Sequence, residues 1–537
     1  MEHIILIKKI KLFSLLFLIL SCVIFALSCL YNKAFFHYLM DGSILWFQLR
    51  QALSILLLSA TGYLLLRCIQ KKIPEMWLYL FSFPVGACLW VFCSFVILLL
   101  GIPYKLPYTL LFMASILLLF YLIQKRLKRA AICSEFHLSA SFIFIGLSLL
   151  VSTGFTYVFL AADSFYYFTN YGYSLTLIGN YAGFAGENSY NLNSIGQFLP
   201  LLCSYTSFWG IDQIYQIQAF LGLNLTICFA WAIYEILEPK TSKKSAVLYS
   251  LTFTGILLTS ASYLIVSGWI LANMYCMVFL FFVMFLGYWK NDKNEFDTQF
   301  LISIYLVALT LLRKDGIIFA CFMLICIAGQ NTYKIKNLIF MLLPSIIMEL
   351  WWLGYVRLVL DAKSSMGAVL NSVANKSNVI MILMIITAAL CYILFIKKYI
   401  IENLIIKRLR IKEYSFLLLG LIFLTILVGI LKPKAIIDNL DVLISNVFQY
   451  PSSWGISGFC FLILLCFILL EKSEITTYYH FVWIGYFLLN FSSYNMAKNS
   501  WINWDDSFNR IILQVVPLFL FACALSIGKM LSSKSKI

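Results

Sequence analysis

The chain has 537 residues, of which 62% are hydrophobic and 12% are charged, and its formal net charge is +16 at pH 7. Soluble domains are about half apolar and about one quarter charged, so this composition excludes an ordinary soluble protein and predicts an all-α polytopic membrane protein. In a soluble chain the positive charge would indicate a nucleic-acid partner. Because Lys and Arg gather in short loops between apolar runs, as in the cytoplasmic loops of membrane proteins, no nucleic-acid partner is expected.

Cysteine and histidine spacing predicts no metal site built from these residues. The 15 cysteines lie almost all inside apolar runs, without a Cys-x-x-Cys pair, and the 4 histidines are scattered. The cysteines are therefore interpreted as small core residues, and neither a disulfide framework nor a histidine-ligated metal is expected.

Apolar runs long enough to cross a bilayer recur along the chain and predict about 14–16 transmembrane helices. The first four form an N-terminal block, 1–137, with few polar residues, and the remaining region, 138–537, carries nearly all candidate functional groups. The candidate spans are 11–30, 52–67, 76–100, 108–124, 138–160, 213–237, 246–266, 270–288, 298–312, 317–330, 337–357, 378–396, 414–431, 455–470, 478–491 and 510–528.

Lys and Arg cluster in alternate loops, for example at 71–72, 125–129 and 407–412. Because cytoplasmic loops collect basic residues, this pattern predicts that both termini are cytoplasmic. The longer loops, including 161–212, then fall on the opposite side together with most of the acidic residues. The polar face of the protein is therefore expected to be extracytoplasmic.

The loop 161–212 is the longest polar run between apolar segments, and it contains no Lys or Arg. Asp163 follows an apolar run, and Tyr167, Asn170 and Tyr171 lie four, seven and eight residues further on, which is one face of a helix. A carboxylate backed by hydroxyls and an amide at the membrane boundary suits binding of a polar group at the bilayer surface. The alternative is an interfacial aromatic belt with a solvated Asp163.

A short charged hairpin, Arg313-Lys314-Asp315-Gly316, separates two apolar runs. Charge at this depth is costly unless it is paired or faces a watery cavity. Either Arg313 and Lys314 meet a phosphate with Asp315 as their partner, or both basic side chains extend to the interface with Asp315 as counter-ion.

The last span begins with a second charged group, Asp505, Asp506 and Arg510. Arg510 either pairs with Asp506 four residues earlier or holds a phosphate through both arms of its guanidinium. The adjacent carboxylates of Asp505 and Asp506 also leave open a divalent cation.

Three segments resemble motifs of the glycosyltransferase-C (GT-C) superfamily, both in their order along the chain and in the side of the membrane on which they are predicted to lie. The resemblance is to a subset of bacterial membrane enzymes in which four extra spans precede the span that leads into the acidic loop. The motifs are an Asp-x-x-x-aromatic element, a Lys-x-Glu-Gly-like element and a Ser-x-x-Arg…Pro element. The corresponding segments are Asp163-Ser-Phe-Tyr-Tyr167, Arg313-Lys314-Asp315-Gly316 and Ser507-Phe-Asn-Arg510 followed by Pro517. The resemblance covers residue 140 to the end. Ser164 stands where many members of the superfamily have a second acid, so metal dependence stays open.

This resemblance implies a GT-C-like fold with helices in the extracytoplasmic loop 161–212. It also implies an inverting transfer of a sugar from a polyprenyl-phosphate donor to a cell-envelope glycan, lipid or other acceptor, on the outer face of a bacterial plasma membrane.

The resemblance further implies roles for individual residues. Asp163 would be the general base that deprotonates the acceptor hydroxyl. Arg510, with Arg313 or Lys314, would hold the donor phosphate. The side chains that would bind the sugar are Tyr166, Tyr167, Asn170 and Gln197.

Two other functions compete with this one. An oligosaccharide repeat-unit polymerase or ligase would require several outer-loop arginines, whereas only Arg50, Arg313, Arg357 and Arg510 are predicted outside. A transporter or flippase would place charge and broken helices near the membrane midplane, often in repeats, whereas no repeat is evident by eye.

Overall fold

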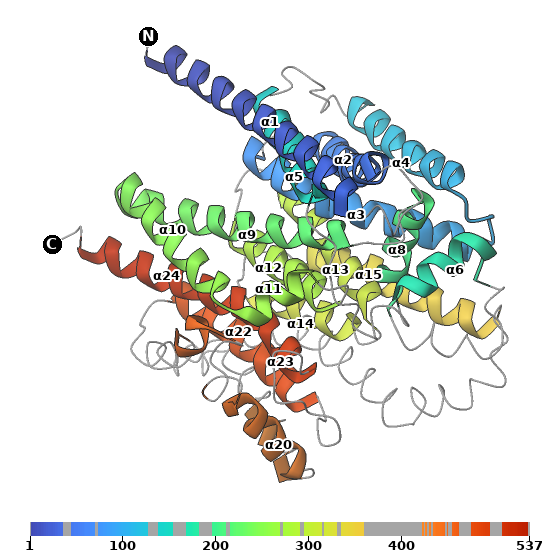
Figure 1. Ribbon diagram of the computed structural model, residues 1–537. Helices are drawn as coiled ribbons and strands as arrows, with labels where there is room; N and C mark the ends of the chain where they lie inside the picture. Colours follow the sequence, from blue (N-terminus) through green and yellow to red (C-terminus); the bar gives the residue numbers. More distant parts are fainter. Residues whose placement is uncertain are drawn as a thin grey trace. The chain divides into compact units, whose positions relative to one another are not determined.

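In the computed structural model, helices make up most of the residues that it describes, joined by turns and short irregular segments (Figure 1). These residues are 2–35, 44–69, 73–126, 138–153, 168–181, 196–210, 215–268, 272–289, 295–313, 316–329, 335–358, 422–423, 425–426, 429–430, 433–445, 448, 454–460, 474–493 and 507–534. The predicted span 378–396 and most of 414–431 and 455–470 lie outside them.

The chain divides into two compact units. The first comprises Met1–Asn224, Gly268–Leu271 and Leu350–Met366, and the second comprises Leu225–Ser267, Ala272–Glu349 and Gly367–Ile537. The boundary predicted at residue 137 falls within the first unit.

The first unit is a bundle in which α2 packs on α3 and α1 packs on α5. Its long helices coincide with the first five predicted spans, and two further helices lie in the polar loop 161–212. The helices are α1 (Glu2–Phe35), α2 (Ile44–Ile69), α3 (Glu75–Leu99), α4 (Leu106–Arg126), α5 (Leu138–Thr153), α6 (Asn170–Ile178) and α8 (Phe198–Phe208).

Proline at position 84 lies inside α3 and removes the backbone N–H that would otherwise bond to the carbonyl of Leu80. The side chain of Asn224 compensates for this loss, since its Nδ2 donates to the Leu80 carbonyl at 2.9 Å. Within an apolar bundle every backbone polar group needs a partner, so Asn224 allows α3 to continue through the proline.

Two glycines allow α2 and α3 to approach closely. A Cβ atom added at Gly62 would lie 1.8 Å from the carbonyl oxygen of Ser82, and one added at Gly86 would lie 1.8 Å from that of Leu58. Small residues permit this backbone contact between apolar helices, where packing rather than water exclusion drives association.

We expect Gly62→Ala to lower the free energy of unfolding by about 1–3 kcal/mol, because the added methyl group must push α2 away from α3. Gly255→Ala is the matched control, since a Cβ atom there has no neighbour within 4 Å. Thermal unfolding of both variants in one detergent measures the difference. Equal melting temperatures for the two variants would contradict the close crossing.

The second unit is built around α12, which is buried on all sides from Met274 to Gly287. A helix that is apolar all round is expected at the centre of a bundle. Its neighbours include α13, α14 and α24. The helices are α9 (Tyr215–Leu237, shared with the first unit), η3 (Glu238–Lys240), α10 (Lys243–Leu258), α11 (Ala261–Gly268), α12 (Ala272–Tyr288), α13 (Glu295–Leu312), α14 (Gly316–Gly329), α15 (Ile335–Leu358, also shared), α20 (Pro433–Ile444), α22 (Glu474–Ser493), α23 (Ser507–Ile512), η6 (Leu513–Val515) and α24 (Val516–Lys534).

The predicted span 246–266 is not one continuous helix. It consists of α10 and α11, which are bent by 82° at a short break. At the break, Ser260 Oγ accepts from the backbone N–H of Tyr263, and Thr259 Oγ1 accepts from that of Ile456. Ser260 thus satisfies a backbone N–H that the bend leaves without a helical partner, and Thr259 joins the break to a segment distant in sequence.

Among the described residues, five helices are long and apolar enough to cross a membrane, or six if α10 and α11 form one span. They are Gln48–Ile69, Met76–Leu99, Leu106–Ile123, Ile217–Lys240 and Arg510–Leu531. Shorter apolar helices accompany them among the described residues. This set of helices indicates a multi-pass membrane protein.

Candidate functional site

Seven of the predicted site residues lie outside the described residues, and four lie within them. Those outside are Asp163, Tyr166, Tyr167, Lys314, Asp315, Asp505 and Asp506. Asn170 and Gln197 belong to the first unit, and Arg313 and Arg510 belong to the second.

Asn170 and Tyr171 do not share an exposed face. Asn170 begins α6 and is exposed, whereas Tyr171 is buried. The burial follows from the contact of α6 with α8, where a Cβ atom added at Gly172 would lie 2.4 Å from that of Cys203. Of these two predicted neighbours, only Asn170 is accessible to a ligand.

Gln197 is only 2% exposed, and its Oε1 accepts a hydrogen bond from the Tyr181 hydroxyl at 3.0 Å. Tyr181 in turn packs edge-on against Trp352 and Tyr355. Gln197 therefore orients a buried aromatic cluster in the described structure, and its predicted contact with a sugar stays a prediction.

A second tyrosine links the polar loop to α3. The Tyr104 hydroxyl lies 2.5 Å from Ser204 Oγ and donates to Ser94 Oγ at 3.1 Å. Burial raises the pKa of Tyr104 to about 12, although its hydrogen bonds to Ser204 and Ser94 lower it. Burial also raises the pKa of Tyr181 well above its ordinary value. Both hydroxyls therefore stay protonated near neutral pH and serve as hydrogen-bond donors rather than acids.

In the second unit, the start of the last span carries a buried polar network. Gln514, in η6, donates from Nε2 to Asn273 Oδ1 at 2.8 Å and accepts from the Tyr486 hydroxyl. Arg510 precedes Gln514 by one helical turn and is 7% exposed. The network therefore connects α12, α22 and the α23–η6 segment through side chains alone.

Arg313 reaches the same network from the hairpin between α13 and α14. Its guanidinium carbon lies 5.2 Å from the ring centroid of Phe319, and that ring lies 5.6 Å from the ring of Tyr486. The charge of Arg313 is also within electrostatic reach of the Tyr486 hydroxyl. The structure thus brings Arg313 and the segment of Arg510 to one polar network, although they are far apart in sequence.

Asn273, Tyr486 and Gln514 are not among the residues predicted for the site. A signal was present for Gln514, since it stands in the apolar run Ile-Ile-Leu-Gln-Val-Val at 511–516. A polar side chain in such a run is a functional candidate by default. Asn273 and Tyr486 are neutral side chains within apolar runs and carry no comparable signal.

Among the described residues, no group of three or more His, Cys, Asp or Glu side chains could hold a metal ion. Buried His480 is hydrogen-bonded on both ring nitrogens: Nδ1 accepts from Trp483 Nε1 at 3.1 Å, and Nε2 lies 2.9 Å from Ser526 Oγ. These bonds explain its place in the core. A divalent cation at Asp505 and Asp506 stays a prediction.

The fold and the site together define an all-α, multi-pass membrane protein in which two arginine-bearing segments meet a buried polar network. Comparison with protein-family models, with curated protein sequences and with solved structures finds no match to this chain.

Proposed function

We propose that the protein transfers a sugar from a polyprenyl-phosphate donor to a cell-envelope acceptor on the extracytoplasmic side of the membrane. The observation that carries this proposal is the convergence of Arg313 and the Arg510 segment on the Tyr486–Gln514 network. Guanidinium groups among apolar helices can bind the anionic group of a lipid, because the low dielectric constant there strengthens the attraction between the two charges. A polyprenyl phosphate supplies both the anion and the apolar tail.

The proposed reaction needs no covalent intermediate. The acceptor hydroxyl oxygen attacks the anomeric carbon, and its proton passes to Asp163 as general base. The bond from the anomeric carbon to the phosphate oxygen breaks, and its electron pair leaves with the phosphate. The arginines stabilise the charge that develops on that phosphate, and Tyr166 and Tyr167 bind the sugar.

One observation favours a second function, that of a transporter or flippase. The 82° bend between α10 and α11 is the kind of broken helix on which membrane transporters build their sites. A flippase would move a lipid-linked sugar across the bilayer without changing its glycosidic bond, so the two functions differ in where the lipid-linked sugar accumulates.

A strain lacking this chain distinguishes the two functions. If the protein is a transferase, the strain should lose one sugar from an envelope glycan and accumulate the lipid-linked sugar in the outer leaflet, where an impermeant lectin detects it. Accumulation in the inner leaflet instead would indicate a flippase. An unchanged glycan and unchanged lipid-linked sugar would contradict both proposals.

A further inference from the structure

Another arginine, Arg50, lies within α2 of the first unit. The described residues provide hydrogen-bond acceptors for only part of its guanidinium group. Its Nη1 donates to the backbone carbonyl of Trp209 at 3.1 Å, just beyond the C-terminal end of α8. Its Nε is buried and has no hydrogen-bond partner among the described residues. A guanidinium carries five N–H donors in a fixed fork, and N–H donation to the Trp209 carbonyl is one contact made by this group within the described part of the chain. A buried N–H without an acceptor is unfavourable, and an anionic ligand would supply the acceptor.

The next residue, Gln51, provides an independent observation. Its side chain is 2% exposed, and within the described part of the chain neither its Oε1 nor its Nε2 has a hydrogen-bond partner. Gln48, one turn earlier, is also buried, but its Nε2 donates to Ser28 Oγ at 3.3 Å. Gln51 therefore adds a buried donor and a buried acceptor at the next position of α2, about 100° around the helix from Arg50, and a ligand that carries both anionic oxygens and hydroxyl groups could engage both side chains.

The backbone around Arg50 leaves space for the guanidinium. Gly210 has a φ of +65°, and a Cβ atom added there would lie 2.6 Å from Arg50 Nη1. Any larger residue at this position would be strained and would also displace the guanidinium. The turn that ends α8 thus accommodates the arginine head group.

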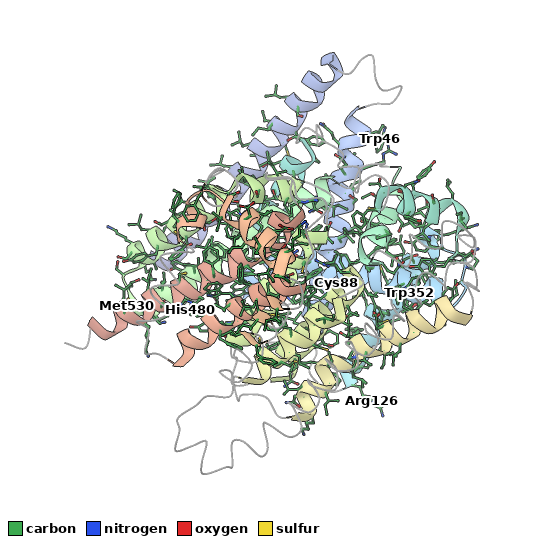
Figure 2. All side chains as sticks on the ribbon, turned by 90° about the horizontal axis from the view of Figure 1, so that it is seen from below. Trp46, Cys88, Arg126, Trp352, His480 and Met530 are labelled. Carbon is green, nitrogen blue, oxygen red and sulfur yellow. The ribbon has the colours of Figure 1, made fainter. Side chains whose placement is uncertain are left out.

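An exposed aromatic ring lies on the same face of α2. Trp46 precedes Arg50 by four residues and is 62% exposed, and it is labelled in Figure 2. Tryptophan favours the boundary between the hydrocarbon and the polar head groups, where its indole can lie beside a lipid. Arg50 lies one helical turn closer to the membrane interior than Trp46, and the long side chain of an arginine at that depth can extend outward to a lipid phosphate.

We propose that Arg50, with Gln51 beside it, binds the phosphate group of an anionic, hydroxyl-bearing lipid head group at the predicted extracytoplasmic end of α2. The guanidinium meets two phosphate oxygens through its unused donors, and the Gln51 amide meets a hydroxyl of the head group. Trp46 lies against the lipid beside them. Arg50 and Gln51 are not among the residues assigned to the proposed sugar transfer, so this lipid-binding proposal does not rest on that function.

The test uses the full-length protein after delipidation in detergent, with phosphatidylglycerol as the probe and phosphatidylcholine as the neutral comparison. Native mass spectrometry counts the lipids that remain bound as phosphatidylglycerol is titrated. We expect Arg50→Gln to bind the anionic lipid about tenfold more weakly than the wild type, since one charge-assisted contact is lost. A parallel titration with inorganic phosphate, monitored through the melting temperature, shows whether free phosphate binds to the site without the rest of the lipid.

Arg126→Gln is the matched control, because it removes the same charge from an exposed position at the end of α4. Arg50→Lys keeps the positive charge but lacks the planar group of parallel N–H donors, so it should bind phosphatidylglycerol with intermediate affinity. Such intermediate binding would show that the weaker binding of Arg50→Gln comes from the site and not from misfolding. Gly210→Ala should weaken binding while every charge remains.

Weaker phosphatidylglycerol binding or a smaller phosphate-induced rise in melting temperature, specific to Arg50→Gln, supports the site. Equal responses of Arg50→Gln and Arg126→Gln to both probes would overturn it.

Discussion

Asp163→Asn is expected to reduce sugar transfer by about 10²–10⁴-fold, the usual cost of losing a general base. Asn keeps the shape and much of the hydrogen bonding of Asp but cannot accept the proton of the acceptor hydroxyl. The prediction rests on the position of Asp163 after an apolar run and on the motif that it begins. Expression and melting temperature should hardly change, because a carboxylate at the membrane boundary contributes little to packing.

The measurement is the glycan composition of cells that carry Asp163→Asn as their only copy, compared with a strain lacking the chain. Loss of the same sugar from both strains supports the assignment. Asp212→Asn is a suitable control, since it removes another acidic residue from the same polar loop. A normal glycan with Asp163→Asn would show that the proton is taken by another group or that the protein has another function.

Arg510→Lys is expected to lower kcat/KM for the lipid-linked donor by about 10–100-fold, and Arg510→Gln by about 10²–10³-fold. Lysine keeps the charge but cannot offer two parallel N–H donors to one phosphate. Because Arg510 is buried one turn before Gln514, either substitution also perturbs the polar network. The melting temperature must therefore be measured beside the transfer rate.

Gln514→Leu separates these two effects, since it disrupts the hydrogen bonds to Asn273 and Tyr486 and leaves the arginine in place. If Arg510 binds the donor phosphate, Arg510→Lys should impair transfer more than Gln514→Leu at equal melting temperature. Wild-type transfer by Arg510→Gln would show that this arginine has only a structural role.

The positions of most helices could be predicted from the sequence. α3, α9 and α12 begin and end within a few residues of the predicted runs 76–100, 213–237 and 270–288. The reason is local: a long apolar segment in a bilayer must satisfy its own backbone hydrogen bonds, and a helix does so within the segment. Within the described part of the loop 161–212, α6 and α8 agree with the helices that the resemblance to a family implies.

The bend between α10 and α11 could not be predicted from the segment itself. The apolar pattern of 246–266 continues across Thr259 and Ser260 without a proline. The backbone N–H that bonds to Thr259 belongs to Ile456, 197 residues later in the chain. A bend stabilised by such a distant partner is invisible to any local pattern.

The sequence by itself predicted an all-α membrane protein and identified Arg313 and Arg510 as candidate phosphate-binding residues. Only the tertiary structure decided that both segments meet at Tyr486, and that Arg50 donates to the carbonyl of Trp209, 159 residues later in the chain. The length of an apolar run and its flanking charges are local quantities, which the order of residues contains directly. Which polar side chains share a buried site depends instead on how helices distant in sequence pack together, because a hydrogen bond or a ring contact requires its partners within a few ångströms.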